Sequence, residues 1–109
     1  MKSKPVLPRH RAVEDVDEAI AWYLGEGSPK AALGFIAALE RAYTQIGRHP
    51  ATGSLRYAQE LALPGLRCWP LARHPQLVFY VERGDHIDVW RVLHGHRDIQ
   101  GWMSQADEG

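Results

Sequence analysis

The spacing of apolar residues changes once along the chain, from a helical period before Pro50 to a strand-like pattern after Gly65. In the first half, apolar side chains recur every three or four residues, the period of an amphipathic helix. In the second half, short segments rich in β-branched and aromatic residues are separated by turn sequences. This order predicts an α+β fold, in which an N-terminal helical hairpin packs on a twisted antiparallel β-sheet with a short C-terminal helix.

The helical half divides into two segments, predicted over 11–24 and 29–46. Ser28 has the character of an N-cap and Pro29 suits the first position of a helix, while Gly25 and Gly27 end the preceding helix. The short connection predicts an antiparallel hairpin. The two apolar stripes comprise Ala12, Val13, Val16, Ala19, Ile20, Tyr23 and Leu24 in the first helix, and Ala32, Phe35, Ile36, Leu39, Tyr43 and Ile46 in the second.

The remaining segments predict strands over 66–71, 76–82 and 86–93, the last two joined by a hairpin turn at "RGD". An edge strand is expected within 2–8, since Pro5 and Pro8 exclude a central position. Gly95 allows a bend, after which Arg97 and Asp98 begin a helix that packs Ile99, Trp102 and Met103 against the sheet. In the last strand we expect one face to hold Ile87, Val89, Arg91 and Leu93, and the other Asp88, Trp90, Val92 and His94.

Length and charge limit the class of protein. A chain of 109 residues predicts one domain over 1–109. Its 13 basic and 13 acidic side chains give zero formal net charge, which disfavours a general nucleic-acid binder. Cys68 is the only cysteine, so neither an internal disulfide nor a cysteine zinc site is possible. We expect a cytoplasmic protein, because the chain has no apolar segment typical of a signal or a membrane span.

The stretch "VLHGHRD" places His94 and His96 two residues apart, but no third metal ligand is spaced to match, so neither a metal nor a cofactor is expected. Cys68, next to Arg67, could be an activated thiol, although a small apolar filler is the favoured interpretation. The acidic run Glu14 to Glu18 is interpreted as a solvated helix face rather than a paired-carboxylate site.

RNA cleavage is a second possibility, because it requires a general base, a general acid and cations near the phosphate. The candidate catalytic residues are Arg67, Arg73, Arg91 and His94. His74, His96, Arg97 and Tyr80 have suitable chemistry, but no spacing joins these groups. The favoured alternative is structural: Arg91 pairs with a carboxylate such as Asp98, and the histidines lie at a solvated strand end.

Four tryptophans are many for one small core, and large amphipathic aromatic side chains are favoured at interfaces. Trp22, Trp69, Trp90 and Trp102, with Arg97, are therefore candidates for binding a partner or a target, although the tryptophans could equally cap the edges of the core.

The ordered set of segments resembles the ParE branch of the RelE/ParE superfamily, the toxins of bacterial type II toxin–antitoxin pairs. The resemblance covers nearly the whole chain and is carried by "AVEDVDEAIAWY", "SPKAALGFIAALERAYTQIGRHPATG" with its Pro-x-x-Gly exit, "GLRCWPL", and "QLVFYVERGDHIDVWRVLHGHRD" with its His-x-x-Arg-Asp end. It implies the fold described above and a small cognate antitoxin, encoded beside this gene, that wraps the toxin.

The resemblance also implies a target. ParE-type toxins bind DNA gyrase and block replication without catalysis, whereas RelE-type toxins cut messenger RNA on the ribosome. Between Arg67 and Arg97 the chain carries five arginines and three carboxylates, a small excess for a site walled by RNA phosphate. We therefore expect a gyrase inhibitor that contacts nucleic acid only through its antitoxin or target. The alternatives are a ribosome-dependent mRNA endoribonuclease, and a degenerate toxin that only binds antitoxin and co-represses its operon.

Overall fold

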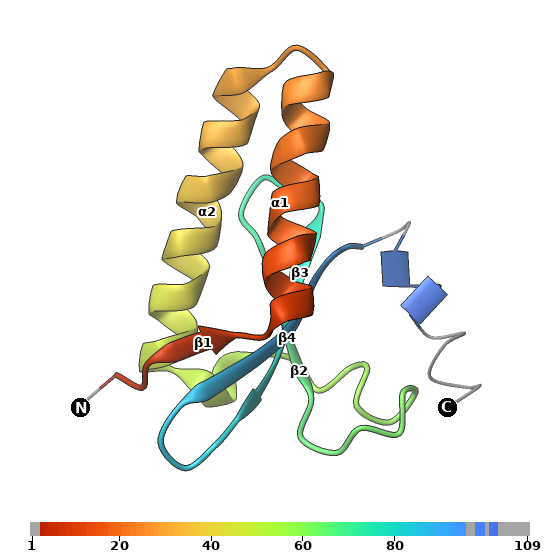
Figure 1. Ribbon diagram of the computed structural model, residues 1–109. Coiled ribbons are helices and arrows are strands. Elements are labelled where there is room, and N and C mark those ends of the chain that lie inside the picture. Colours follow the sequence, from red (N-terminus) through yellow and green to blue (C-terminus); the bar gives the residue numbers. More distant parts are fainter. Residues whose placement is uncertain (1–2, 96–97, 100, 103–109) are drawn as a thin grey trace.

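The computed structural model describes residues 3–95, 98–99 and 101–102, and it has the α+β architecture expected from the sequence (Figure 1). The elements are β1 (Val6–Pro8), α1 (His10–Gly25), α2 (Pro29–Arg48), the 3₁₀ helix η1 (Pro50–Thr52), β2 (Arg67–Pro70), β3 (Gln76–Glu82) and β4 (Ile87–His94). Residues 98–99 and 101–102 are helical, where the sequence predicts the C-terminal helix. Within the described ranges, no helix is both long enough and apolar enough to cross a membrane.

The helical hairpin forms as its capping residues predict. The Ser28 hydroxyl accepts a hydrogen bond from the Ala31 backbone N–H at 3.2 Å, and Pro29 is the first residue of α2. Gly27 has a φ of +76°, which only glycine adopts without strain, so the connection is short. The predicted stripes face the sheet, except that Val13 and Leu24 are 43% and 52% exposed at the margin of α1.

The four strands form one sheet in the order β1-β4-β3-β2. The pairs β2–β3 and β3–β4 are antiparallel as predicted, but β1 pairs with β4 in parallel, so the sheet is mixed. A parallel neighbour needs a long crossover connection, and here the helical hairpin and the meander together provide it. The expected edge position of β1 is confirmed, with β4 as its partner in the sheet.

A β-bulge in β4 changes which side chains face the helices. Phe79 pairs with Arg91 and Tyr80 with Val89, so Trp90 is an extra residue with no partner in β3. The predicted alternation is therefore wrong beyond Val89. Val92, not Leu93, joins Ile87 and Val89 in the cluster under the helices.

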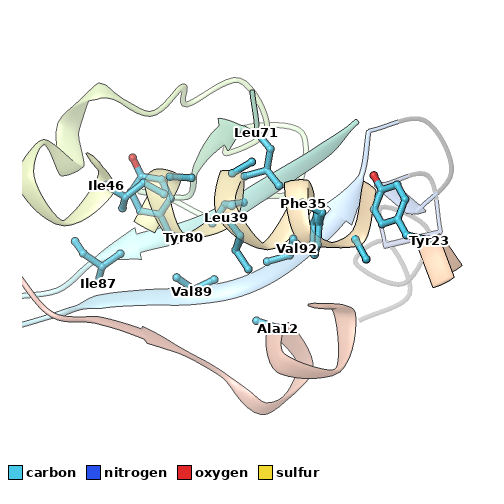
Figure 2. Packing of buried hydrophobic residues seen from close by; sticks show 14 residues of the cluster. Ala12, Tyr23, Phe35, Leu39, Ile46, Leu71, Tyr80, Ile87, Val89 and Val92 are labelled. Carbon is cyan, nitrogen blue, oxygen red and sulfur yellow. The ribbon is translucent and has the colours of Figure 1, made fainter. Parts of the chain in front are cut away.

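Both faces of the sheet are covered. Figure 2 shows side chains of α2, such as Phe35 and Leu39, meeting those of β3 and β4 in the helix-side cluster. The opposite face carries a second cluster, which is covered by the turns over 55–66 and by the C-terminal segment. Its buried members are Tyr57, Leu61, Leu66, Cys68, Phe79, Val81, Leu93 and Ile99. Ile99 and Trp102 pack there as predicted, while Met103 lies outside the described residues.

Candidate functional site

A groove runs along α1, between this helix and the end of β4 with the C-terminal segment. It consists of three adjoining hollows of about 270, 250 and 240 Å³ that share lining residues. Arg11, Asp15, Glu18 and Trp22 form one wall, and their spacing of four, three and four residues places them on one helix face. We call these hollows together the α1 groove. Its other lining residues are Arg9, Ala19, Gln76, Trp90, Arg91, Val92, Leu93, His94, Asp98, Gly101 and Trp102.

Asp15 is the buried member of the wall that α1 forms, and it joins the helix to the bulged strand. Its carboxylate accepts hydrogen bonds from Arg91 Nε at 2.8 Å, Arg91 Nη2 at 2.9 Å and the Val92 backbone N–H at 3.0 Å. The side chains of Asp15 and Arg91 are only 7% and 15% exposed. These hydrogen bonds raise the pKa of the Arg91 guanidinium, so it remains charged. Burial, aided by the Asp15 carboxylate, raises the pKa of the neighbouring Tyr43 to about 12.

These contacts correct two interpretations of the sequence. The partner of Arg91 is Asp15, not Asp98, whose carboxylate instead accepts a hydrogen bond from the His94 backbone N–H at 3.0 Å. The acidic run is not wholly a solvated face, because Asp15 is buried. Its position could have shown this, since Asp15 is three residues after Ala12 and four before Ala19, within the apolar stripe.

A second buried carboxylate, Asp88, organises the N-terminal end of the groove. It accepts hydrogen bonds from Arg9, Arg83 and the Trp90 indole N–H at 2.9–3.3 Å. Burial opposes the ionisation of Asp88, but these hydrogen bonds outweigh it and hold its pKa at about 2. The Arg9 guanidinium also lies 4.4 Å from the centre of the Trp90 ring, a cation–π contact. Neither Asp15 nor Asp88 was a candidate from the sequence.

The Pro-x-x-Gly exit of α2 is explained by Tyr80. Its hydroxyl donates to the Pro50 carbonyl at 2.8 Å and accepts from the Gly53 N–H at 3.1 Å. A Cβ at residue 53 would overlap this hydroxyl, so glycine is required there by space. Tyr80 is fully buried, and burial raises the pKa of its phenol. It therefore stabilises the fold rather than facing a substrate.

The candidate ribonuclease residues do not converge. Arg67 in β2 pairs with Tyr80 in β3, which pairs with Val89 in β4. The Arg67 side chain donates a hydrogen bond to the Gly53 carbonyl at 2.8 Å. His94 pairs with Gln76, four residues before Tyr80 in β3, which is about 13 Å along the sheet at about 3.3 Å per residue. Arg73 occupies the exposed turn between β2 and β3, with a φ of +65°. Only Arg91 and His94 line the α1 groove, and the Arg91 guanidinium is already bound to Asp15.

The four tryptophans divide between groove and core. Trp22, which is 47% exposed, lies at one end of the groove, and Trp90 and Trp102 lie at the other. Trp69 instead packs against the helix-side cluster. Trp102 also makes an edge contact with Phe79, with ring centroids 4.9 Å apart. Arg97 lies outside the described residues.

The other chemical candidates have structural surroundings. Cys68 is 6% exposed in the second cluster, and burial raises the pKa of its thiol, in agreement with an apolar filler. In the part of the chain that the structure describes, no three histidine, cysteine or acidic side chains are grouped to hold a metal ion. His96, one of the two histidines considered, is outside that part.

Comparison with known proteins places this fold in a family. A family model described as "ParE toxin of type II toxin-antitoxin system, parDE" matches residues 6–99. A solved structure titled "Chromosomal ParDE TA system from P. aeruginosa" is similar over 84% of this chain and 96% of its own, with a TM-score of 0.70 and 20% sequence identity. At that identity the likeness shows the fold alone. A comparison with curated proteins finds no significant match. Because the family match spans most of the sequence, the chain belongs to the ParE toxin family of type II toxin–antitoxin systems.

Proposed function

We propose that this protein arrests bacterial growth by binding DNA gyrase and trapping it on cleaved DNA, and that a small antitoxin encoded beside it neutralises this effect. Membership of the ParE family supports both parts of the proposal. The zero net charge also supports a protein target, because a ribosome-dependent nuclease has to approach dense RNA phosphate.

One observation carries the proposal: candidate ribonuclease side chains are already hydrogen-bonded to other groups of the protein. Arg91 is bound to Asp15, Arg67 holds the Gly53 carbonyl, and the Tyr80 hydroxyl bridges two backbone groups. A general acid and base must reach the same reacting atoms, whereas Arg67 and His94 lie at opposite ends of the sheet. A toxin that acts by binding does not require these groups to converge.

The experiment is a supercoiling assay with purified protein, gyrase, ATP and relaxed plasmid. We expect inhibition of supercoiling and accumulation of linear plasmid after denaturation of the trapped complex. In parallel, a cell-free translation reaction reports cleavage of messenger RNA. Unimpeded supercoiling together with codon-specific mRNA cleavage would replace the proposal by the endoribonuclease alternative.

The antitoxin is the second part of the proposal. Trp22, Trp90 and Trp102 line the α1 groove, and amphipathic aromatic side chains of this kind suit a protein interface. We place the protein and its partner in the bacterial cytoplasm, where gyrase acts. Co-expression with the neighbouring small reading frame should give a stable complex and restore growth. Complex formation without any growth arrest by the toxin alone would identify a degenerate toxin that only binds its antitoxin.

A further inference from the structure

The α1 groove changes electrostatic character along its length. At the N-terminal end of α1, one hollow is lined by Arg9, Arg11, Trp90, Arg91 and Trp102, and by no carboxylate among the described residues. The middle hollow adds three acidic side chains, Asp15, Glu18 and Asp98. The far hollow shares these three acidic side chains and adds Gln76 and His94 together with the apolar Ala19, Trp22 and Val92. The groove thus runs, parallel to α1, from a basic end to an acidic middle, and the half-exposed indole of Trp22 lies at its far end.

The basic end is built to receive a carboxylate. Arg9 and Arg91 are oriented by the carboxylates of Asp88 and Asp15, respectively, so little side-chain entropy remains to be lost on binding. Arg11 is exposed and has no ion pair with any other described residue. The Arg11 guanidinium can form bidentate hydrogen bonds to a carboxylate, and the Trp90 and Trp102 indoles beside it offer aromatic surface to the apolar stem of that side chain.

The middle of the groove has the opposite preference. Glu18 is exposed on the wall formed by α1, and Asp98 faces it from the C-terminal segment. Asp15 is neutralised by Arg91, so Glu18 and Asp98 give this hollow its negative character. A lysine or arginine placed here would complement both carboxylates. A long polyanion would set its phosphates against them, which argues against a nucleic-acid strand in the groove.

The length of the groove limits the size of the occupant. Arg11 and Trp22 are eleven residues apart on α1, about 16 Å at about 1.5 Å per residue. This distance corresponds to about five residues of extended peptide at about 3.3 Å each, or to about three turns of helix. A groove of this length suits a short segment of a small protein better than the broad surface of a large globular target.

We infer that the α1 groove binds a short antitoxin segment whose side chains run acidic, then basic, then apolar from the Arg11 end to the Trp22 end of α1. This inference rests on the proposed function, and it adds the location and charge order of the antitoxin contact. The acidic side chain meets Arg11, with Arg9 beside it, and the basic one meets Glu18 and Asp98. An apolar side chain then covers Trp22.

The test uses two charge reversals in the groove, Arg11→Glu and Glu18→Lys. Arg41→Glu and Glu40→Lys are matched controls, because both residues are exposed on α2 and line no part of the groove. The partner is the purified product of the small reading frame beside the gene, and its affinity is measured by titration calorimetry. We expect each groove variant to weaken binding at least about tenfold and each control to change it less than about twofold.

Two further measurements define the occupant. Overlapping synthetic 15-residue peptides that cover the reading-frame product should include one that binds wild-type protein and carries the acidic-basic-apolar order. Oligothymidylate of 12 nucleotides should neither bind the groove nor compete with that peptide. Equal affinity of groove variants and controls, a binding peptide without this charge order, or competition by the oligonucleotide would each overturn the inference.

The outcomes separate this inference from the proposed function. If the wild-type protein binds the reading-frame product but the groove variants bind it equally well, only the inference fails. If no complex forms with the wild-type protein, the antitoxin part of the proposed function fails as well. Circular dichroism of all four variants should match the wild type, since each substitution is at an exposed position.

Discussion

The buried contact between Asp15 and β4 offers a direct perturbation of the fold, through the substitution Asp15→Ala. It leaves the Arg91 guanidinium without its partner and the Val92 N–H without an acceptor. Breaking a buried ion pair by removing one member costs about 3–5 kcal/mol. Because Arg91 keeps some solvent contact, with 15% of its side chain exposed, we expect the lower end of this range, about 3 kcal/mol.

Asp17→Ala is the matched control, because Asp17 is exposed on the same helix and has the same charge. The gain in helix propensity on replacing aspartate by alanine is common to both variants and cancels in the comparison. Urea unfolding followed by circular dichroism measures the difference. With a slope of about 1.5 kcal/mol per molar urea, the midpoint of Asp15→Ala should fall about 2 M below that of Asp17→Ala.

The double variant Asp15→Ala/Arg91→Ala should lose less stability than the sum of the two single variants, because the second substitution removes a guanidinium that has already lost its partner. If the free energies of unfolding of Asp15→Ala and Asp17→Ala lie within about 0.5 kcal/mol of each other, the Asp15 contact does not stabilise the protein as described.

Three further predictions concern other groups. The pKa of Asp88 in the folded protein, about 2, is below its ordinary value of 3.8. Ionised Asp88 therefore contributes roughly 2 kcal/mol to the free energy of unfolding above about pH 5, and this contribution is lost as the pH falls toward 2. Asp88→Asn should remove this part of the pH dependence of unfolding, and an unchanged acid unfolding profile would contradict the assignment. Gly53→Ala should destabilise the fold by about 1–3 kcal/mol in urea melts, because the new Cβ displaces the Tyr80 hydroxyl. Adding Tyr80→Phe should relieve part of this loss, whereas additive losses of the two variants would disprove the steric explanation. A double variant with His94→Ala and Arg73→Ala should arrest growth on induction within about twofold of the wild type. Loss of growth arrest by a normally folded double variant would favour RNA cleavage.

Local signals in the sequence were sufficient for most of the secondary structure. The Ser28–Pro29 start of α2 and the β-branched and aromatic run of β3 depend on neighbouring residues alone, and both elements are as predicted. The parallel pairing of β1 with β4 was not predicted, because a three-residue edge strand carries no signal for its partner. The bulge at Trp90 was also missed, and the single extra residue moved Val92 and Leu93 to the opposite faces from those expected.

The candidate site was predicted less completely than the fold. Residues chosen for their chemistry, such as Arg67 and Arg91, are held by fold contacts that join positions far apart in the sequence. Asp15 lies in an acidic run typical of a solvated helix face, whereas its place in the apolar stripe indicates the burial that the structure has. The charge order of the α1 groove depends on α1 and β4 lying side by side, which no local pattern predicts.

The most direct test of the central claim is the gyrase supercoiling reaction with increasing amounts of purified toxin, followed by denaturation and electrophoresis of the plasmid. We expect supercoiled product to disappear while linear plasmid accumulates, and prior addition of the neighbouring reading-frame product to abolish both effects. Supercoiling at the control rate with toxin in excess over gyrase, by protein that arrests growth in cells, would contradict the claim.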